Sequence, residues 1–228
     1  MEPLILSNRE QRQLAGQYLD LCLTCGTCIG GCPVTGVDGM DMRKALRMVL
    51  LGMEQELIDS RFPWICTLCA RCEHACPMGI DLMKMMRSAR TRRSRDKVPG
   101  VLHKGVEMCL KTGNNVGIPK DDFLFLLEDM SAELAEELPG FEGVPVDKKG
   151  ARILVTINSK EPFGEPEDML FWWKIFHAAG ESWTTTSENW EGVNWGLFTG
   201  DDPSMKEVVS RIVKNYKELE CEYLLLPE

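Results

Sequence analysis

Two copies of one cysteine pattern constrain the fold of this chain more than any other feature of its sequence. Each copy holds four cysteines separated by two, two and three residues, and a proline directly follows the last cysteine. The first copy runs from Cys22 to Pro33 and the second from Cys66 to Pro77. Each position of the second copy lies 44 residues after its counterpart, prolines included, so the chain contains an internal duplication.

Clustered thiols at this spacing predict metal binding. The chain holds ten cysteines and its first residues lack the layout of a secretion signal, so we expect a reducing compartment, in which such thiols favour metals over disulfides. Three thiolates at i, i+3 and i+6 in a tight loop can each take one iron corner of a cubane cluster. The fourth corner needs a ligand from elsewhere, because a short loop cannot surround the cluster and the proline turns the chain away.

The spacing matches that of bacterial ferredoxins, in which the fourth cysteine of each motif binds the other cluster of the pair. The match implies two [4Fe–4S] clusters, named cluster 1 and cluster 2 below. The implied ligands are Cys22, Cys25, Cys28 and Cys76 for cluster 1, and Cys66, Cys69, Cys72 and Cys32 for cluster 2. Two four-cysteine zinc sites are the alternative, but zinc needs only two pairs of cysteines and has no use for the third step or for the prolines.

The segments that flank the motifs predict an α-helical module. Residues 42–51 carry apolar side chains at a 3.6-residue period, with Gly52 as the stop. Residues 80–87 predict a second helix with Asp81 as its N-cap, and residues 8–20 are also compatible with a helix. Compact bacterial ferredoxins join their motifs by short turns and strands, so the helical spacer of this chain departs from them.

The cysteine motifs and their spacer resemble the iron–sulfur C subunit of heterodisulfide reductase. The resemblance is carried by the run from Cys22 to Cys28, by the helical spacer and by Trp64-Ile65-Cys66-Thr67-Leu68-Cys69. The same module occurs in the larger, fused D-type heterodisulfide reductase and in iron–sulfur subunits of glycolate, lactate and anaerobic glycerol-3-phosphate oxidoreductases. The resemblance spans roughly residues 15–95 and implies an α-helical ferredoxin fold with two [4Fe–4S] clusters, while complexes with different reactions reuse this module.

The rest of the chain predicts two further helices and then a change of texture. Helices are expected over 101–112 and 121–138. Residues 139–150 hold three glycines, two prolines and a lysine pair, and we place a domain boundary there. Beyond it, strands are expected to alternate with helices, the pattern of a parallel α/β unit, over residues 153–157, 169–179, 181–186, 203–219 and 223–226.

The predicted fold class is therefore mainly α, with two domains. An α-helical ferredoxin domain with a helical extension covers 1–138, and a small α/β domain covers 151–228. The second domain resembles the first half of the cysteine-rich domain that follows the ferredoxin module in the fused D-type reductase. That domain carries Cys-Cys-Gly motifs for a further, catalytic cluster, whereas the corresponding loop here reads Gly192-Val193-Asn194-Trp195-Gly196 and holds no thiol.

Two cysteines stand outside the motifs, Cys109 and Cys221, and both are expected to be structural. No catalytic residue is recognisable in the chain, which lacks a Gly-rich phosphate loop, a Ser–His–Asp set and a nicotinamide fingerprint. Because Glu228 closely follows an expected strand, we expect the native polypeptide to continue, with completion of the domain by a partner as the alternative.

Charge limits the partners that this chain can take. The 35 acidic and 26 basic residues give a formal net charge of −9, which argues against a dedicated nucleic-acid binder. No apolar stretch reaches the ~18 residues of a membrane-spanning helix. One basic run could dock a flavoprotein or another acidic redox partner, neutralise nearby cluster charge, or form a solvated helix face, the usual role of such runs. Its members are Arg87, Arg90, Arg92, Arg93, Arg95 and Lys97.

These observations favour one function and leave two alternatives. The first hypothesis is an iron–sulfur electron-transfer subunit of a heterodisulfide reductase-like or related multi-subunit oxidoreductase complex. It would relay single electrons between a flavin-bearing or membrane-bound partner and a catalytic subunit, an end point implied by the resemblance alone. The expected location is the cytoplasm, with membrane attachment only through partners. The alternatives are the N-terminal part of a fused, catalytic D-type reductase, and a zinc-stabilised interaction module without redox function.

Overall fold

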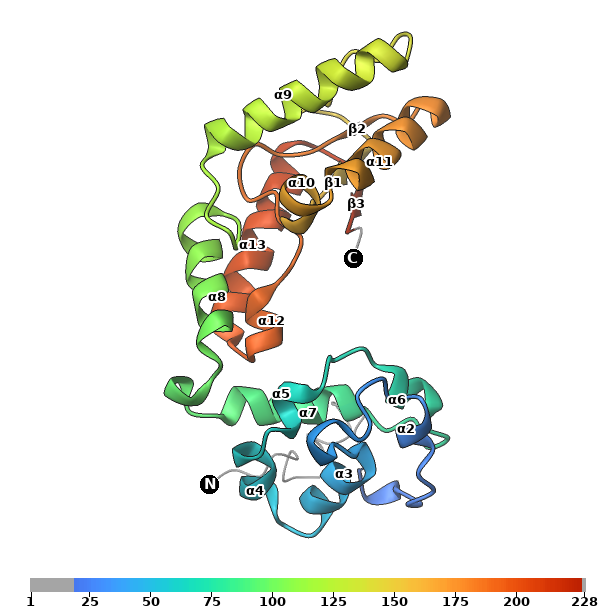
Figure 1. Cartoon of the computed structure of the whole chain (residues 1–228), viewed down its shortest axis with the longest axis vertical. Coiled ribbons are helices and arrows are strands. Elements are labelled where there is room, and N and C mark those ends of the chain that lie inside the picture. The colour runs from blue at the N-terminus through green and yellow to red at the C-terminus, as the bar shows by residue number, and fades with distance from the viewer. Residues whose placement is uncertain (1–18, 227–228) are drawn as a thin grey trace. The chain divides into compact units, whose positions relative to one another are not determined.

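The computed structural model describes residues 19–226, which form two compact units that are described separately (Figure 1). The first unit comprises the described residues up to Pro99 together with the segment Leu197–Asp201. The second unit comprises Gly100–Gly196 and the residues from Asp202 onward. Of the helix expected at 8–20, residues 8–18 lie outside the described part of the chain.

Short helices and loops build the first unit. In chain order they are η1 (Leu19–Leu21), α2 (Thr27–Gly30), η2 (Val37–Gly39), α3 (Met42–Leu50), α4 (Glu54–Asp59), α5 (Phe62–Ile65), α6 (Arg71–Ala75), α7 (Leu82–Arg92) and η3 (Arg95–Lys97). The helices predicted over 42–51 and 80–87 are confirmed as α3 and α7, and α7 continues five residues beyond the prediction. The α-helical character expected of the cysteine-bearing region is therefore confirmed.

The duplication extends beyond the cysteines into these two helices. Asp41 caps α3 by accepting a hydrogen bond from the Lys44 N–H at 2.9 Å, and Asp81 caps α7 by accepting one from the Lys84 N–H at 2.8 Å. Such caps satisfy backbone donors that the first helical turn leaves without partners. The two caps are 40 residues apart, whereas the cysteines are 44 apart, so the first copy has four extra residues between its proline and its cap.

The core of the first unit lies between α3, α4 and α7. The buried faces of these helices bring together apolar side chains that include Leu46, Leu57, Met85 and Met86. Burying one such side chain contributes about 1.5–3 kcal/mol, so this layer stabilises the first unit. Cys66 and Cys72 belong to the same buried cluster, which means that part of the second cysteine motif is built into the core.

The second unit is a three-stranded parallel sheet with helices on both faces. Its elements are α8 (Gly100–Thr112), α9 (Lys120–Glu137), β1 (Ile153–Val155), α10 (Lys160–Gly164), α11 (Pro166–Ala179), β2 (Trp183–Thr184), the first residues of α12 (Trp195–Thr199), α13 (Asp202–Glu218) and β3 (Tyr223–Leu225). The strand order is β2-β1-β3, and β1 pairs in parallel with both neighbours. The expected parallel alternation of strands and helices is confirmed, with strands shorter than the sequence predicted.

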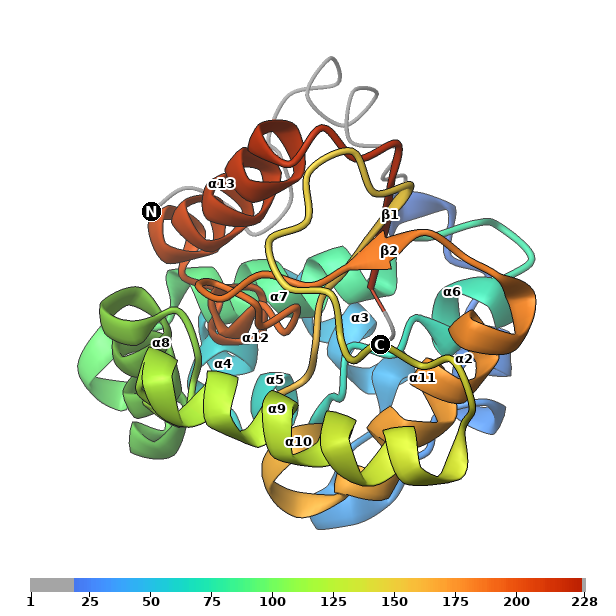
Figure 2. The ribbon, with the colours of Figure 1, turned by 90° about the horizontal axis from the view of Figure 1, so that it is seen from above.

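Successive residues of β1 bury their side chains on opposite faces of the sheet. Val155 packs in a core shared with α9 and α11, in which Phe123 stacks on Trp190 with ring centroids 4.3 Å apart. Leu154 packs with Cys221 and with Tyr216 of α13 on the other face. Figure 2 shows α13 on one side of the sheet and α9 with α11 on the other. This period of two is the alternation that a sheet covered on both faces requires.

Helix α9, which the sequence pattern assigned to the first domain, contributes Phe123, Leu127 and Leu134 to the core of the sheet. Compactness within one chain does not by itself define the units that fold alone. The domain limits 1–138 and 151–228 therefore stay a prediction. No helix among residues 19–226 is long and apolar enough to cross a membrane.

Candidate metal centre

Two cavities in the first unit are each lined by four cysteines. Cavity 1 is lined by Cys22, Cys25, Cys28 and Cys76. Cavity 2 is lined by Cys32, Cys66, Cys69 and Cys72. Each cavity thus receives three cysteines from one motif and the fourth from the other, which is the crossover that the ferredoxin spacing implies. The ten cysteines, all of which lie within residues 19–226, form no disulfide. The roles of the eight as cluster ligands stay a prediction.

The loops around both cavities share an unusual backbone conformation. Thr24 and Gly26 have φ of 54° and 82°, and their counterparts 44 residues later, Leu68 and Ala70, have φ of 55° and 59°. Positive φ is uncommon for residues with a Cβ and strains the backbone, so it persists only where the surrounding structure requires it. The internal duplication is therefore a duplication of backbone geometry as well as of residue type.

This conformation turns backbone N–H groups toward the sulfur atoms. The Thr24 N–H donates to the Cys22 Sγ at 3.4 Å. Alternation of right-handed and left-handed residues makes a concave nest of N–H groups, which suits an anion. Both loops are thus shaped to stabilise negative charge on their thiols.

The cysteines differ in the ease with which each one gives up its proton. Cys25 and Cys69, the second cysteine of each motif, are exposed. A hydrogen bond with the Thr27 hydroxyl, 3.1 Å from the sulfur, lowers the pKa of Cys25, and the backbone N–H of Arg71 followed by the Thr67 hydroxyl lowers the pKa of Cys69. Burial raises the pKa of Cys66 and raises that of Cys72 to about 12. Binding a metal at the buried cysteines must therefore displace tightly held protons.

The donor set and the walls of both cavities fit a [4Fe–4S] cluster. Each cavity offers four thiols from two separate loops, as a cubane with four iron corners requires. Its other walls include apolar side chains, among them Leu46 and Ile80 in cavity 1 and Val34 and Met83 in cavity 2. Across the described residues, no three Cys, His, Asp or Glu side chains converge on a point that a single metal ion could occupy.

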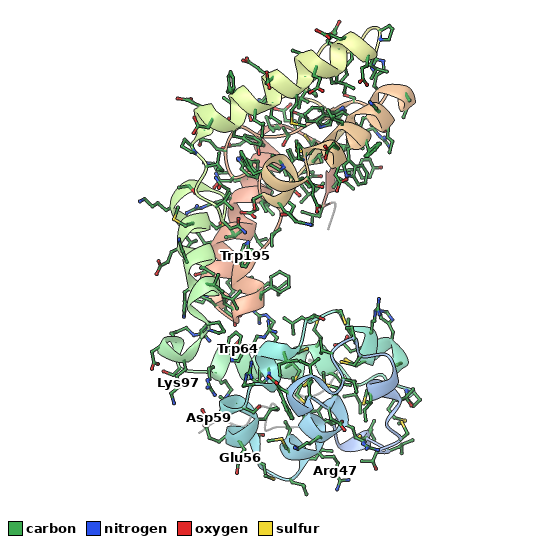
Figure 3. The ribbon with its side chains drawn as sticks, in the orientation of Figure 1. Arg47, Glu56, Asp59, Trp64, Lys97 and Trp195 are labelled. Atoms are coloured by element: carbon green, nitrogen blue, oxygen red, sulfur yellow. The ribbon has the colours of Figure 1, made fainter. Side chains whose placement is uncertain are left out.

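Two arginines of the basic run are built into the first unit. Arg90 is only 4% exposed, and its guanidinium donates to the carbonyls of Pro63 at 2.7 Å and Phe198 at 2.6 Å, and to that of Cys66. Arg93 donates to Asp59 at 2.9 Å; Figure 3 labels this carboxylate on α4. For these two side chains, two of the interpretations of the basic run, a solvated helix face and a docking surface, are therefore wrong.

In the sequence, Arg90 is distinguished only as one member of that run. The signal was present, because α7 buries Leu82, Met85, Met86 and Ala89, and Arg90 directly follows the last of these. A strict application of the helical period would have placed Arg90 at the edge of the buried stripe.

The cysteines outside the motifs line neither cavity. Cys109 and Cys221 are both buried in hydrophobic clusters of the second unit, as expected for structural residues. In the loop that would correspond to a Cys-Cys-Gly motif, Gly192 packs so tightly that an added Cβ would lie 2.4 Å from the Thr156 hydroxyl oxygen. That position thus leaves no room for a larger side chain.

Comparison with known protein families gives the class of this first unit: residues 18–80 match the 4Fe–4S dicluster domain. The chain therefore carries an iron–sulfur dicluster domain within a mainly helical fold.

The chain is also similar to curated C subunits of heterodisulfide reductases, three of which are described here. It is 31% identical over 108 residues to the C subunit of the H(2):CoB-CoM heterodisulfide,ferredoxin reductase of Methanothermobacter thermautotrophicus, which covers 47% of this chain and 57% of that protein. It is 34% identical over 98 residues to the iron–sulfur C subunit of the CoB–CoM heterodisulfide reductase of Methanopyrus kandleri, covering 42% and 51%. It is 30% identical over 108 residues to the C subunit of the ferredoxin:CoB-CoM heterodisulfide reductase of Methanosarcina mazei, covering 47% and 66%.

The resemblance to the iron–sulfur C subunit of heterodisulfide reductase is thus confirmed. The chain spans little more than half the length of the first two of these relatives.

Proposed function

We propose that this chain is an iron–sulfur electron-transfer subunit of a heterodisulfide reductase-like or related multi-subunit oxidoreductase complex. The observation that carries the proposal is the pair of cavities, each lined by three cysteines of one motif and the fourth of the other. The match to a dicluster domain and the similarity to C subunits of heterodisulfide reductases support it. Cluster 1 would be held by the cysteines of cavity 1 and cluster 2 by those of cavity 2.

A [4Fe–4S] cluster in each cavity supplies reversible one-electron chemistry. The residues of the chain hold that group and set its environment. The thiols bind the iron atoms, the inward N–H groups of the loops stabilise negative charge, and side chains such as Ile80 and Met83 keep water out. Cys25 and Cys69 lie at the surface, which gives an electron a short path to a partner at each cavity.

The partners proposed are other subunits of a redox complex: a flavoprotein or membrane-bound subunit on one side and a catalytic subunit on the other. The names of the relatives support this proposal, since each is a subunit of a heterodisulfide reductase. A location in the cytoplasm and the domain limits 1–138 and 151–228 are part of the same proposal.

The first experiment is iron and sulfide analysis of the anaerobically purified chain, with an absorption spectrum and EPR after dithionite. We expect about eight iron and eight sulfide per chain and a broad visible absorption band. Two zinc ions and a colourless protein would refute the proposal in favour of the zinc-stabilised module.

The crossover of ligands can be tested with two double variants. Each variant removes two thiols, either both from one cavity or one from each cavity. Cys22→Ser with Cys76→Ser removes two thiols from cavity 1, so about four iron should remain at cavity 2. Cys22→Ser with Cys32→Ser removes one thiol from each cavity, so both clusters should be weakened and less iron should remain. The opposite order of iron contents would show that each motif binds its own cluster.

The three-stranded parallel sheet of the second unit favours one further candidate, the N-terminal part of a fused D-type reductase. Sequencing the gene beyond codon 228 tests it directly. A continuation with Cys-Cys-Gly motifs would support the fused reductase, and a stop codon would refute it.

A further inference from the structure

The second cysteine motif lies beside a buried positive charge. Arg90 is held 4% exposed between Pro63, Cys66 and Phe198, and its guanidinium lies 5.2 Å from the centroid of the Trp64 ring. Its hydrogen-bond acceptors in the described part of the chain are all backbone carbonyls. Among residues 19–226, no carboxylate forms an ion pair with it, in contrast to Arg93, which pairs with Asp59. A cation removed from water without an anion is costly, so such groups are normally paired.

The anion that would complete this arrangement belongs in cavity 2. Cys66, whose carbonyl accepts from Arg90, also lines that cavity. Four thiolates around a cluster core of charge about +2 leave a net charge of about −2 on the whole group. Because Arg90 and Cys66 are both buried, the attraction between the guanidinium and negative charge at Cys66 is weakly screened.

A separate segment of the chain covers this guanidinium. The segment Leu197–Asp201 lies over it, with Phe198 accepting from Arg90 and Thr199 accepting from Arg95 at 2.9 Å. Gly200 has φ of 71°, and an added Cβ there would lie 2.5 Å from the Thr91 backbone nitrogen. The segment is therefore seated directly on the helix that carries Arg90.

The first half of the duplication has no equivalent of this charge. When the two helices are aligned on their caps, Asp41 and Asp81, the position of Arg90 corresponds to Leu50. Arg43 does line cavity 1, but it is exposed, and solvent screens its charge. Within the described residues, only the second copy of the duplicated cysteine motif therefore has a buried cation beside it.

We propose that Arg90 is the internal counter-ion of cluster 2 and raises the reduction potential of that cluster above the value it would have without the charge. The inference rests on the proposed function, since it requires a cluster in cavity 2. Reduction adds one negative charge to the cluster, and a fixed cation nearby stabilises the reduced form more than the oxidised form. Arg90 acts here through electrostatics and does not itself bind iron.

The test is an EPR-monitored redox titration of the whole chain under anaerobic conditions, with iron analysis of the same samples. Arg90→Gln removes the charge but keeps hydrogen-bond donors, and Arg90→Lys keeps the charge but loses the planar fork. Arg93→Gln is the matched control, because Arg93 lies on the turn that follows α7 and is bound to Asp59 and the Ile58 carbonyl. Cys22→Ser removes one ligand of cluster 1, so the EPR signal that this variant weakens is assigned to cluster 1 and the other to cluster 2.

We expect Arg90→Gln to shift the midpoint potential of cluster 2 to more negative values and to leave cluster 1 unchanged. Arg90→Lys and Arg93→Gln should leave both potentials close to those of the wild type. If Arg90→Gln fails to load cluster 2 while Arg90→Lys loads it at an unchanged potential, the requirement for charge is also supported.

Two results would overturn the inference. Unchanged potentials in a fully loaded Arg90→Gln variant would show that the charge does not act on the cluster. Equal shifts of the cluster 2 potential, or equal losses of its iron, in Arg90→Lys and Arg90→Gln would show that cluster 2 depends on the geometry of the guanidinium and not on its charge. A wild-type chain with a single cluster or none would instead refute the proposed function, and this inference with it.

Discussion

Replacing Gly200 with alanine should weaken the packing of the segment Leu197–Asp201 on the first unit enough to release it part of the time. The left-handed backbone at φ of 71° costs a residue with a Cβ about 1–2 kcal/mol. The new Cβ would also lie 2.5 Å from the Thr91 nitrogen and 2.8 Å from the Arg90 carbonyl carbon, both backbone atoms that cannot swing away. Overpacking of this kind costs about 1–3 kcal/mol, so the total is about 2–5 kcal/mol.

The segment can avoid that cost only by leaving its seat. It is anchored there by the hydrogen bonds from Arg90 to Phe198 and from Arg95 to Thr199, each with a charged donor. Such bonds contribute about 1.5–3 kcal/mol each, a sum of about 3–6 kcal/mol. The two ranges overlap, so in Gly200→Ala the seated and the released states should be close in free energy.

Hydrogen exchange followed by mass spectrometry measures this release. In Gly200→Ala, we expect exchange of the backbone amides in 197–201 to accelerate by more than about tenfold, which corresponds to about 1.4 kcal/mol. Gly52→Ala is the matched control in the same unit, because Gly52 has φ of 76° but an added Cβ would meet nothing within 4 Å. Unchanged exchange of 197–201 in Gly200→Ala would refute the close packing of this segment.

Three other substitutions probe the loops and the two cores. Ala70→Gly should stabilise the iron-loaded chain by about 0.5–1 kcal/mol in denaturant titrations, since φ of 59° suits glycine better than alanine; a lower stability would contradict a left-handed Ala70. Met86→Ala should destabilise the first unit by about 2–5 kcal/mol, because Met86 is fully buried, and a smaller loss would count against this core. Burial, followed by the charge of Glu191, raises the pKa of Cys109 to about 12. The free energy of unfolding of the iron-free chain should therefore fall as pH rises above about 9, where the thiol ionises in the unfolded chain but not in the folded one. In unfolding experiments at several pH values, Cys109→Ala should reduce this fall.

The features that sequence reasoning predicted well depend on local chemistry. The cysteine spacing fixes the short loops, and the caps Asp41 and Asp81 mark the helices that follow them. The strands of the second unit were found because β1 and β3 are short apolar runs between turn residues. Each of these signals lies within a few residues of the structure that it predicts.

The features that were missed depend on partners far away in the sequence. The carbonyl of Phe198 lies 108 residues from Arg90, and nothing in the composition of either segment indicates that they meet. The contacts of α9 are also long-range, since this Leu- and Glu-rich helix buries Phe123 against Trp190 in the core of the sheet. Long-range packing of this kind overrides local texture, which is why segment boundaries are harder to predict than segments.

The duplication separates what the two cavities share from what distinguishes them. Both cavities have the same four-cysteine frame and the same left-handed loop residues, so both suit the same group. Their surroundings differ: the first copy has four extra residues before its helix, and the position of the buried Arg90 is occupied there by Leu50. If both cavities hold clusters, as we propose, two identical groups sit in unequal electrostatic environments. Unequal potentials would favour cluster 2, beside the buried cation, as the residence of a single electron, whereas two equivalent clusters would share it.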